Sequence, residues 1–242
     1  MALTAVGLGA LVSLAGAVFF DERINSVEGG SAPLSWSDPE ESSDDTTAII
    51  LSPGQTLIIE GDSLIAGRAG GVEHGPDWPS LLRQALADRS GLDVYIINRG
   101  LGGATASKGA QRWRDTRCGD VALILYGAND AAVRGWLRGR KAVGLAQYRT
   151  ALKQIIARYR ACDARVGVIA PLPPASRAMS RRLAPYRKAA REVAQTQGVL
   201  FLDPGQALLS KDAPLQADGL HLSRAGRDAL AEFFANQIEP AQ

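Results

Sequence analysis

Five short apolar runs, each separated from the next by enough residues for a helix, indicate the fold of this chain. Hydrophobicity within a run is almost continuous, as at residues 121–125, which read Val-Ala-Leu-Ile-Leu. Such runs are typical of parallel strands that are covered on both faces, because a half-exposed strand alternates apolar and polar residues. We therefore expect buried parallel strands at residues 56–60, 93–98, 121–126, 166–170 and 199–203.

Candidate helices fill the intervals between these runs. We expect them at about residues 79–89, 105–114, 145–160 and 181–197, with a last helix after Ser223. In the third helix, apolar residues recur at spacings of three and four, which gives the helix one core-facing side. Ser223 suits the N-cap of the last helix because its hydroxyl oxygen accepts a backbone N–H. The alternation predicts an α/β fold, a three-layer α/β/α sandwich around a five-stranded parallel sheet.

The first 55 residues differ in composition from the remainder. Residues 2–20 carry no charge and are about long enough to cross a bilayer, so residues 1–20 are predicted to be a transmembrane anchor or a signal segment. The basic start of an export signal is missing, but Ala15–Ala17 fits a small-x-small cleavage pattern. Residues 21–55 are predicted to be an acidic flexible linker, and the folded domain to occupy residues 56–242.

Charge is divided between these two parts of the chain. Residues 1–55 hold one basic and eight acidic side chains, a net of −7, so the whole chain's +2 leaves +9 for the rest. A basic domain can favour an anionic substrate or membrane surface, although an ordinary solvated face has the same composition. No base-reading motif accompanies the charge, and nucleic acid is not an expected partner.

The two cysteines, Cys118 and Cys162, are too few and too far apart in sequence to suggest a zinc site. Each lies shortly before a predicted strand, and those two strands are expected to be neighbours in a parallel sheet. We therefore predict a Cys118–Cys162 disulfide, which fits an oxidising compartment. The alternative is a pair of unpaired buried thiols.

Polar, glycine-containing segments follow three of the predicted strands. Ser63 follows the first, Gly100–Gly103 the second and Gly127–Asp130 the third. Ligands of open parallel sheets gather at the carboxyl ends of the strands, so the fold can bring these segments together. A serine becomes a strong nucleophile when a base lies within hydrogen-bond reach and another group orients that base.

Two histidines are candidates for the base. His221 has Asp218 three residues earlier, which can hold its ring, whereas His74 lies in a turn-rich stretch and is expected to be an ordinary loop residue. Asp62 is expected to hydrogen-bond nearby backbone, and Asp130 to cap the helix that follows it. The G-x-S-x-G elbow of α/β-hydrolases is absent.

Four blocks of this sequence, taken together, resemble those of the SGNH (GDSL) hydrolase superfamily over about residues 56–238: Gly61–Leu64, Asn98–Thr105, Gly127–Asp130 and Asp218–His221. The resemblance implies a flavodoxin-like SGNH hydrolase fold, with Ser63 as nucleophile, His221 as general base and Asp218 orienting the imidazole. It implies an oxyanion hole made by the backbone N–H groups of Ser63 and Gly103 and the side-chain amide of Asn129. Gly100 and Gly102 stand in the same block as alternatives to Gly103. Neither a cofactor nor a metal is indicated.

We accordingly expect a serine-dependent esterase that forms an acyl-enzyme at Ser63, with a small-acyl substrate such as an acetylated envelope glycan. Within the superfamily the alternatives are a thioesterase or lysophospholipase and an O-acyltransferase; outside it, the alternative is a non-catalytic envelope binding module.

The protein is expected to be exported, and either anchored by residues 2–20 on the periplasmic or extracellular side or secreted after cleavage of residues 1–17.

Two arginine-containing loops are candidates for a substrate rim. Trp136, Arg138 and Arg140 follow the third predicted strand. Pro171–Pro174 follows the fourth, with Arg177, Arg181 and Arg182 shortly after it. Both loops join bulky apolar groups to cations, which suits an acyl chain or an acylated anionic glycan or lipid, while the alternative is solvent-facing arginines with a packed tryptophan.

Overall fold

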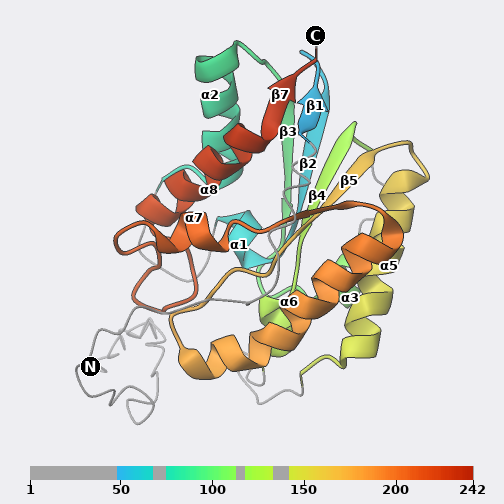
Figure 1. The fold of residues 1–242 in the computed structure, drawn as a ribbon, viewed down its shortest axis with the longest axis vertical. Helices are drawn as coiled ribbons and strands as arrows, with labels where there is room; N and C mark the ends of the chain where they lie inside the picture. The colour runs from blue at the N-terminus through green and yellow to red at the C-terminus, as the bar shows by residue number, and fades with distance from the viewer. Residues whose placement is uncertain (1–47, 68–74, 113–117, 133–141, 242) are drawn as a thin grey trace, which may run out of the picture. The chain divides into compact units, whose positions relative to one another are not determined.

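The structure is a computed structural model that describes residues 48–67, 75–112, 118–132 and 142–241. In this part of the chain, five strands form a parallel sheet in the order β3-β2-β4-β5-β6, and Figure 1 shows the first four of them side by side. The strands are β2 (Thr56–Gly61), β3 (Tyr95–Gly100), β4 (Val121–Leu125), β5 (Arg165–Ile169) and β6 (Leu200–Leu202). The predicted five-stranded parallel sheet is confirmed.

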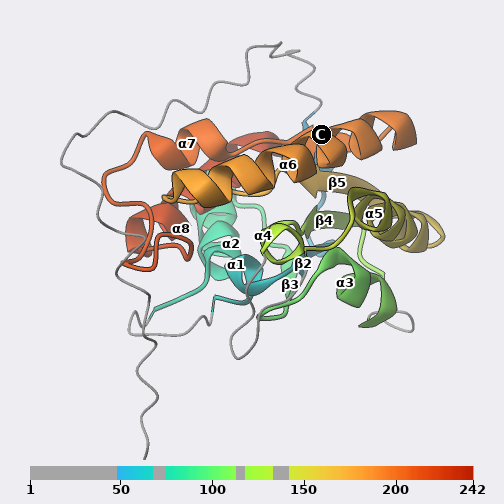
Figure 2. The ribbon, with the colours of Figure 1, turned by 90° about the horizontal axis from the view of Figure 1, so that it is seen from below.

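Helices cover both faces of this sheet, which gives the predicted three layers. Figure 2 shows α2 and α8 on one side of β2 and β4, and α3 and α5 together on the other. The first core contains residues of α1 (Ser63–Ala66), α2 (Trp78–Ser90), α7 (Gly205–Leu209) and α8 (Arg224–Gln237). The second contains residues of α3 (Ala106–Arg112), α4 (Ala128–Ala131), α5 (Leu145–Arg160) and α6 (Arg177–Gln197).

Successive residues of the central strands point into different cores. In β2, Leu57 and Ile59 belong to the first core and Ile58 to the second. In β4, Leu123 lies in the first core and Ile124 in the second. Apolar residues are therefore required at every position, and this explains the continuous hydrophobicity of the sequence runs.

A second, two-stranded parallel sheet pairs β1 (Ile49–Leu51) with β7 (Ile238–Pro240). Ile49 and Leu51 are buried in the first core. Residues 49–51 belong to the segment predicted to be a linker, with the folded domain expected from residue 56, so the structure extends the folded part by this strand. Three residues are too few to give a periodic hydrophobic signal.

The predicted anchor at residues 2–20 and the linker up to residue 47 lie outside the described residues. Within the described ranges, no helix combines the length and the apolar character that crossing a membrane requires.

Side-chain caps define where several helices begin. The hydroxyl of Ser223 accepts the N–H of Gly226 at 3.2 Å at the start of α8, which confirms the predicted cap. Helix α6 begins at Arg177 rather than Arg181, because Ser176 caps it by accepting the N–H of Met179 at 3.3 Å.

Cys118 and Cys162 are joined by a disulfide that closes a separation of 44 residues. Cys118 precedes β4, while Cys162 lies between α5 and β5, the neighbour of β4 in the sheet. The bond thus links the two chain segments that lead into adjacent strands.

Candidate active site

The carboxyl ends of β2, β3 and β4 lie side by side. Gly61, the last residue of β2, is paired with Gly100 on one side and with Leu125 on the other. The segments that follow these strands therefore start from one edge of the sheet, where ligands of parallel sheets bind. The sequence-predicted groups at Ser63, Gly103 and Asn129 all lie in these segments.

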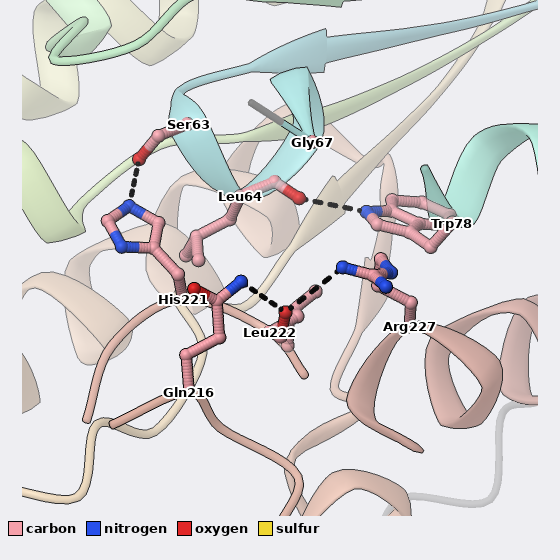
Figure 3. Close-up of a pocket in the computed structure, with 8 residues that line it drawn as sticks. All are labelled: Ser63, Leu64, Gly67, Trp78, Gln216, His221, Leu222 and Arg227. Carbon is pink, nitrogen blue, oxygen red and sulfur yellow. Dashed lines mark hydrogen bonds between the residues drawn. The ribbon is translucent and has the colours of Figure 1, made fainter. Parts of the chain in front are cut away.

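The side chains of Ser63, His221 and Asp218 are joined by two consecutive hydrogen bonds. Nε2 of His221 lies 3.0 Å from Oγ of Ser63, and Nδ1 of His221 lies 2.5 Å from Oδ2 of Asp218. Figure 3 shows the imidazole of His221 directed at the Ser63 hydroxyl. A histidine held at one ring nitrogen and facing a hydroxyl with the other is arranged to accept the hydroxyl proton.

Asp218 is also held by its own loop. Its Oδ1 accepts the backbone N–H groups of Leu220 at 3.0 Å and of His221 at 2.9 Å. Partial burial acts to raise the pKa of Asp218, but the hydrogen bonds from the His221 ring and from these two N–H groups outweigh it, so the pKa is lowered. The carboxylate is therefore ionised when it faces the imidazole.

A facing segment of the chain fixes the loop that carries His221. The backbone N–H of Gln216 donates to the carbonyl of His221 at 2.7 Å, and its side-chain amide donates to the carbonyl of Leu222 at 3.0 Å. Ser223 donates through its hydroxyl to the carbonyl of Ala213 at 2.6 Å. The loop is thus clamped on both sides of the histidine before α8 begins.

Ser63 is the first residue of α1, which follows β2 after a single residue. That residue, Asp62, is the N-cap, and its Oδ1 accepts the N–H of Leu64 at 2.9 Å. The tight connection needs Gly100 beside it, because a Cβ there would stand 2.1 Å from the backbone nitrogen of Ala66. The backbone N–H of Ser63 lies in the first turn, where it has no intrahelical acceptor.

The structure separates the three glycines of the second block. Gly100 packs against α1, and its N–H donates to Oδ1 of Asn98 at 2.8 Å, so it is committed to the scaffold. Gly102 and Gly103 are exposed, and Gly103 has a φ of +70°, in the left-handed region that favours glycine. The role of the Gly103 N–H in an oxyanion hole stays a prediction, and Gly100 is no longer an alternative to it.

Asn129, the third expected oxyanion donor, lies in α4 directly after β4. Its side-chain Nδ2 donates to Oδ2 of Asp62 at 3.3 Å, which ties the amide to the residue next to Ser63. The amide of Asn129 and the first turn of α1 are thereby linked. A side-chain amide can stabilise an oxyanion without introducing a competing charge.

The chain is similar to known proteins. The model of the GDSL-like Lipase/Acylhydrolase family matches residues 60–229, which is most of the described chain and contains all the residues named above. This chain belongs to that family. It is therefore an enzyme, an esterase of the GDSL type. No curated protein matches the chain in a sequence search.

Solved structures share the fold of this GDSL-type esterase. A lipase/acylhydrolase from Enterococcus faecalis is 26% identical, with a TM-score of 0.63 over 78% of this chain and 99% of that one. An enzyme described as an alpha/beta hydrolase, from the metagenome of Lake Arreo in Spain, is 26% identical, with a TM-score of 0.65 over 77% and 96%. An acetylxylan esterase from Geobacillus stearothermophilus, 23% identical, has a TM-score of 0.67 over 78% and 96%.

A small cavity of the esterase adjoins Ser63 and His221. Its volume is about 20 Å³, against the roughly 10–15 Å³ that one water molecule needs. The side chains of Leu64, Trp78 and Leu222 line it, with Gln216 and Arg227 at its polar side (Figure 3). This cavity is therefore little larger than the space that one water molecule needs.

The expected substrate rim is only partly described. Trp136, Arg138 and Arg140 lie outside the described residues, as does His74. Pro171–Pro174 is buried, and the carbonyl of Pro171 accepts a hydrogen bond from Arg187 at 2.5 Å. This proline segment is packing rather than an apolar rim. Arg177, Arg181 and Arg182 are exposed, and they lie in α6 rather than in a loop.

Two acidic residues are more closely involved with the site than the sequence suggested. Asp62 is 1% exposed, and its burial, opposed by the Leu64 N–H bond and reinforced by the charge of Asp130, raises its pKa to about 7. The expectation that Asp130 caps its own helix is wrong. Asp130 instead accepts the N–H of Ala106, at the start of α3, at 3.1 Å. The bond from the Leu64 N–H to Asp62 confirms the expected contact of Asp62 with nearby backbone. The contact of Asp130 with Ala106 has no local sequence signal, because the two residues are 24 positions apart.

Proposed function

We propose that this esterase hydrolyses small-acyl esters through an acyl-enzyme formed at Ser63. The observation that carries the proposal is the hydrogen bonding of His221 to Ser63 at 3.0 Å and to Asp218 at 2.5 Å. A binding module has no need of this arrangement. Catalytic mutants of the Geobacillus acetylxylan esterase, which shares the fold, replace a serine and an aspartate by alanine, and this supports a serine and aspartate mechanism here.

In the proposed reaction, His221 takes the proton of Ser63 at Nε2 while Oγ attacks the ester carbonyl carbon. The carbonyl oxygen becomes an oxyanion, which the N–H groups of Ser63 and Gly103 and the amide of Asn129 stabilise. His221 then returns the proton to the leaving alcohol as the carbon–oxygen bond breaks, which leaves the acyl group on Oγ. Water repeats these steps with His221 as base, releasing the carboxylic acid and restoring the Ser63 hydroxyl.

Asp218 stabilises the imidazolium that forms in both halves of the reaction. Its lowered pKa keeps it ionised at neutral pH, and the Nδ1 contact holds Nε2 toward Ser63. The carboxylate does not need to accept the proton itself.

For the substrate we propose an acetyl ester of a glycan. The cavity that Ser63 and His221 line has a volume of about 20 Å³, little more than one water molecule needs, and this favours a small acyl group. The acetylxylan esterase that shares the fold acts on such an ester.

We further propose that the protein is exported and acts on the cell envelope. The Cys118–Cys162 disulfide and the uncharged segment at residues 2–20 support this location.

The test uses the full chain with p-nitrophenyl acetate, butyrate and octanoate, and with acetylated xylan assayed for released acetate. Ser63→Ala is the matched control for the nucleophile. We expect turnover that falls with acyl length and disappears in Ser63→Ala, together with labelling of the wild-type Ser63 by a serine-directed phosphonate. An active Ser63→Ala variant would exclude the acyl-enzyme, and preference for octanoate would exclude the small-acyl assignment. Acyl transfer to an added sugar in place of acetate release would favour the O-acyltransferase.

A further inference from the structure

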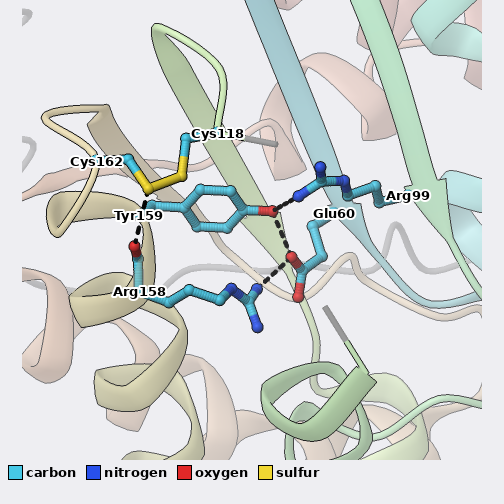
Figure 4. Close-up of a disulfide and its surroundings, with 6 residues drawn as sticks. All are labelled: Glu60, Arg99, Cys118, Arg158, Tyr159 and Cys162. Carbon is cyan, nitrogen blue, oxygen red and sulfur yellow. Dashed lines mark hydrogen bonds and ion pairs between the residues drawn. A yellow bond between two sulfur atoms is a disulfide. The ribbon is translucent and has the colours of Figure 1, made fainter. Parts of the chain in front are cut away.

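Glu60 is a fully buried carboxylate that the proposed reaction does not use. It lies on β2, three residues before Ser63, and is 0% exposed. Its Oε1 accepts the hydroxyl of Tyr126 at 3.1 Å, and its Oε2 accepts the hydroxyl of Tyr159 at 2.5 Å and Nη2 of Arg158 at 2.6 Å. Figure 4 shows Tyr159 and Arg158 reaching Glu60 from α5. An acid in this position is costly to bury, so its several donors are the reason it is tolerated.

The network includes one residue at the end of each strand that leads to the oxyanion hole. Glu60 is the last residue but one of β2. Arg99, near the end of β3 and paired with Glu60 in the sheet, donates from Nη1 to the Tyr159 hydroxyl at 3.1 Å. Tyr126 directly follows β4. These three residues stand three or four positions before Ser63, Gly103 and Asn129, in the same order.

Helix α5 serves as the common support of the three strand ends. Besides Arg158 and Tyr159 it carries Tyr148, whose hydroxyl donates to the backbone carbonyl of Tyr126 at 2.9 Å. Arg158 also donates from Nη1 to the carbonyl of Gly109 in α3 at 3.2 Å. The Cys118–Cys162 disulfide ties the segment after α5 to the entry of β4 (Figure 4).

We propose that Glu60 is a positioning residue: through Tyr159 and Tyr126 it fixes the relative placement of the strand ends that carry Ser63, Gly103 and Asn129. Because an oxyanion hole stabilises the transition state only when its donors converge on one point, small shifts between strands reduce kcat. A displacement of about 1 Å can cost on the order of 100-fold in rate. This inference rests on the proposed function, since it assigns Glu60 a task within that site.

The test is Glu60→Gln, which keeps the size of the side chain but removes its charge and turns one acceptor into a donor. With p-nitrophenyl acetate we expect kcat to fall by roughly 10-fold or more with KM within about 2-fold, as for lost transition-state stabilisation. The affinity for phenylboronic acid, which adds to a serine hydroxyl as a tetrahedral mimic, should fall in parallel. Val193→Ala, a buried change on α6 in the same layer, is the control for destabilisation and should lower Tm with kcat retained.

Tyr159→Phe provides a second variant, because it removes one hydroxyl that joins Glu60 to Arg99 and leaves the charges in place. Tyr159→Phe should also lower kcat and the affinity for phenylboronic acid, with KM unchanged. If Glu60→Gln does not fold, Tyr159→Phe alone tests whether the network positions the strand ends. If either variant folds and has a lower Tm but an unchanged kcat, the network only stabilises the fold, and the inference is overturned. An inactive wild type would instead mean failure of the proposed function, so the two failures are distinguishable.

Discussion

Nε2 of His221 lies 3.0 Å from Oγ of Ser63, although the two residues are 158 positions apart in sequence. Ser63 opens the helix that follows strand β2, and His221 lies in the loop that leads into α8, which packs against α2. The contact therefore exists only when both the sheet and its α2–α8 layer are assembled. Catalytic competence is thus a property of the folded domain rather than of either segment.

Neutralising Asp218 should inactivate the enzyme while leaving it folded. Asp218→Asn removes the charge that stabilises the imidazolium and presents an amide N–H to Nδ1, which favours the wrong tautomer of His221. We expect kcat to fall by on the order of 10³–10⁴-fold, as in Ser-His-Asp triads generally. Steady-state kinetics with p-nitrophenyl acetate measure this. Asp228→Asn, which breaks an exposed ion pair on α8, should keep wild-type activity; a similar loss there would show that the effect is not specific to the triad.

Removal of the Asn129 amide should affect the transition state more than substrate binding. Asn129→Ala takes away the only side-chain donor of the proposed oxyanion hole, and we expect kcat to fall about 10²–10³-fold with a much smaller change in KM. Kinetics at saturating and limiting ester separate the two effects. Asn236→Ala, at an exposed position, is the matched amide deletion and should leave kcat unchanged. A rise in KM alone would assign Asn129 to substrate binding.

The sequence predicted what depends on local pattern, and it missed what depends on the packing of distant segments. Strand positions followed from continuous apolar runs because each strand has two buried faces. Ser63 and His221 stood out because they belong to motifs with few chemical alternatives. Strand β1 was too short to give a signal. Glu60 looks like a polar residue at a strand end, and its partners Arg158 and Tyr159 come from a helix about 100 residues later.

Asp62 should make the stability of the domain depend on pH. Its pKa of about 7 in the folded state exceeds the ordinary value of 3.8, so the folded protein holds this proton more tightly than the unfolded chain. As pH rises from about 4 to 7, the unfolded chain ionises first, and the free energy of unfolding falls. The contribution of Asp62 to this fall should be absent in Asp62→Asn, which keeps a capping oxygen.

Urea unfolding of the wild type and Asp62→Asn at several pH values between 4.5 and 9 measures this effect. The difference between the two free energies of unfolding should change up to about pH 7 and stay constant above it. Glu60 and Asp218 are present in both proteins, so their own titrations cancel to first order. A difference that is independent of pH would mean that Asp62 titrates alike in both states.

Loss of the disulfide should lower stability substantially. The Cys118–Cys162 bond closes a separation of 44 residues, which by the chain-entropy relation contributes about 4 kcal/mol to the free energy of unfolding. Urea unfolding of the Cys118→Ser/Cys162→Ser double variant, compared with the oxidised wild type, gives this number. Reductant should destabilise the wild type and leave the double variant unchanged. If reductant has no effect on either protein, the bond is not formed in solution.

Enlarging the cavity beside Ser63 should extend the range of acyl groups. Leu222→Ala removes an apolar wall of the cavity but keeps the backbone carbonyl that accepts hydrogen bonds from Gln216 and Arg227. Because one or two methylenes in an apolar pocket change discrimination about 10–200-fold, we expect the ratio of kcat/KM for butyrate to that for acetate to rise at least about 10-fold. Leu208→Ala, an equal deletion in the same core but outside the cavity, should leave the ratio unchanged. A ratio that moves equally in both variants would mean that core loosening, rather than the cavity, sets acyl specificity.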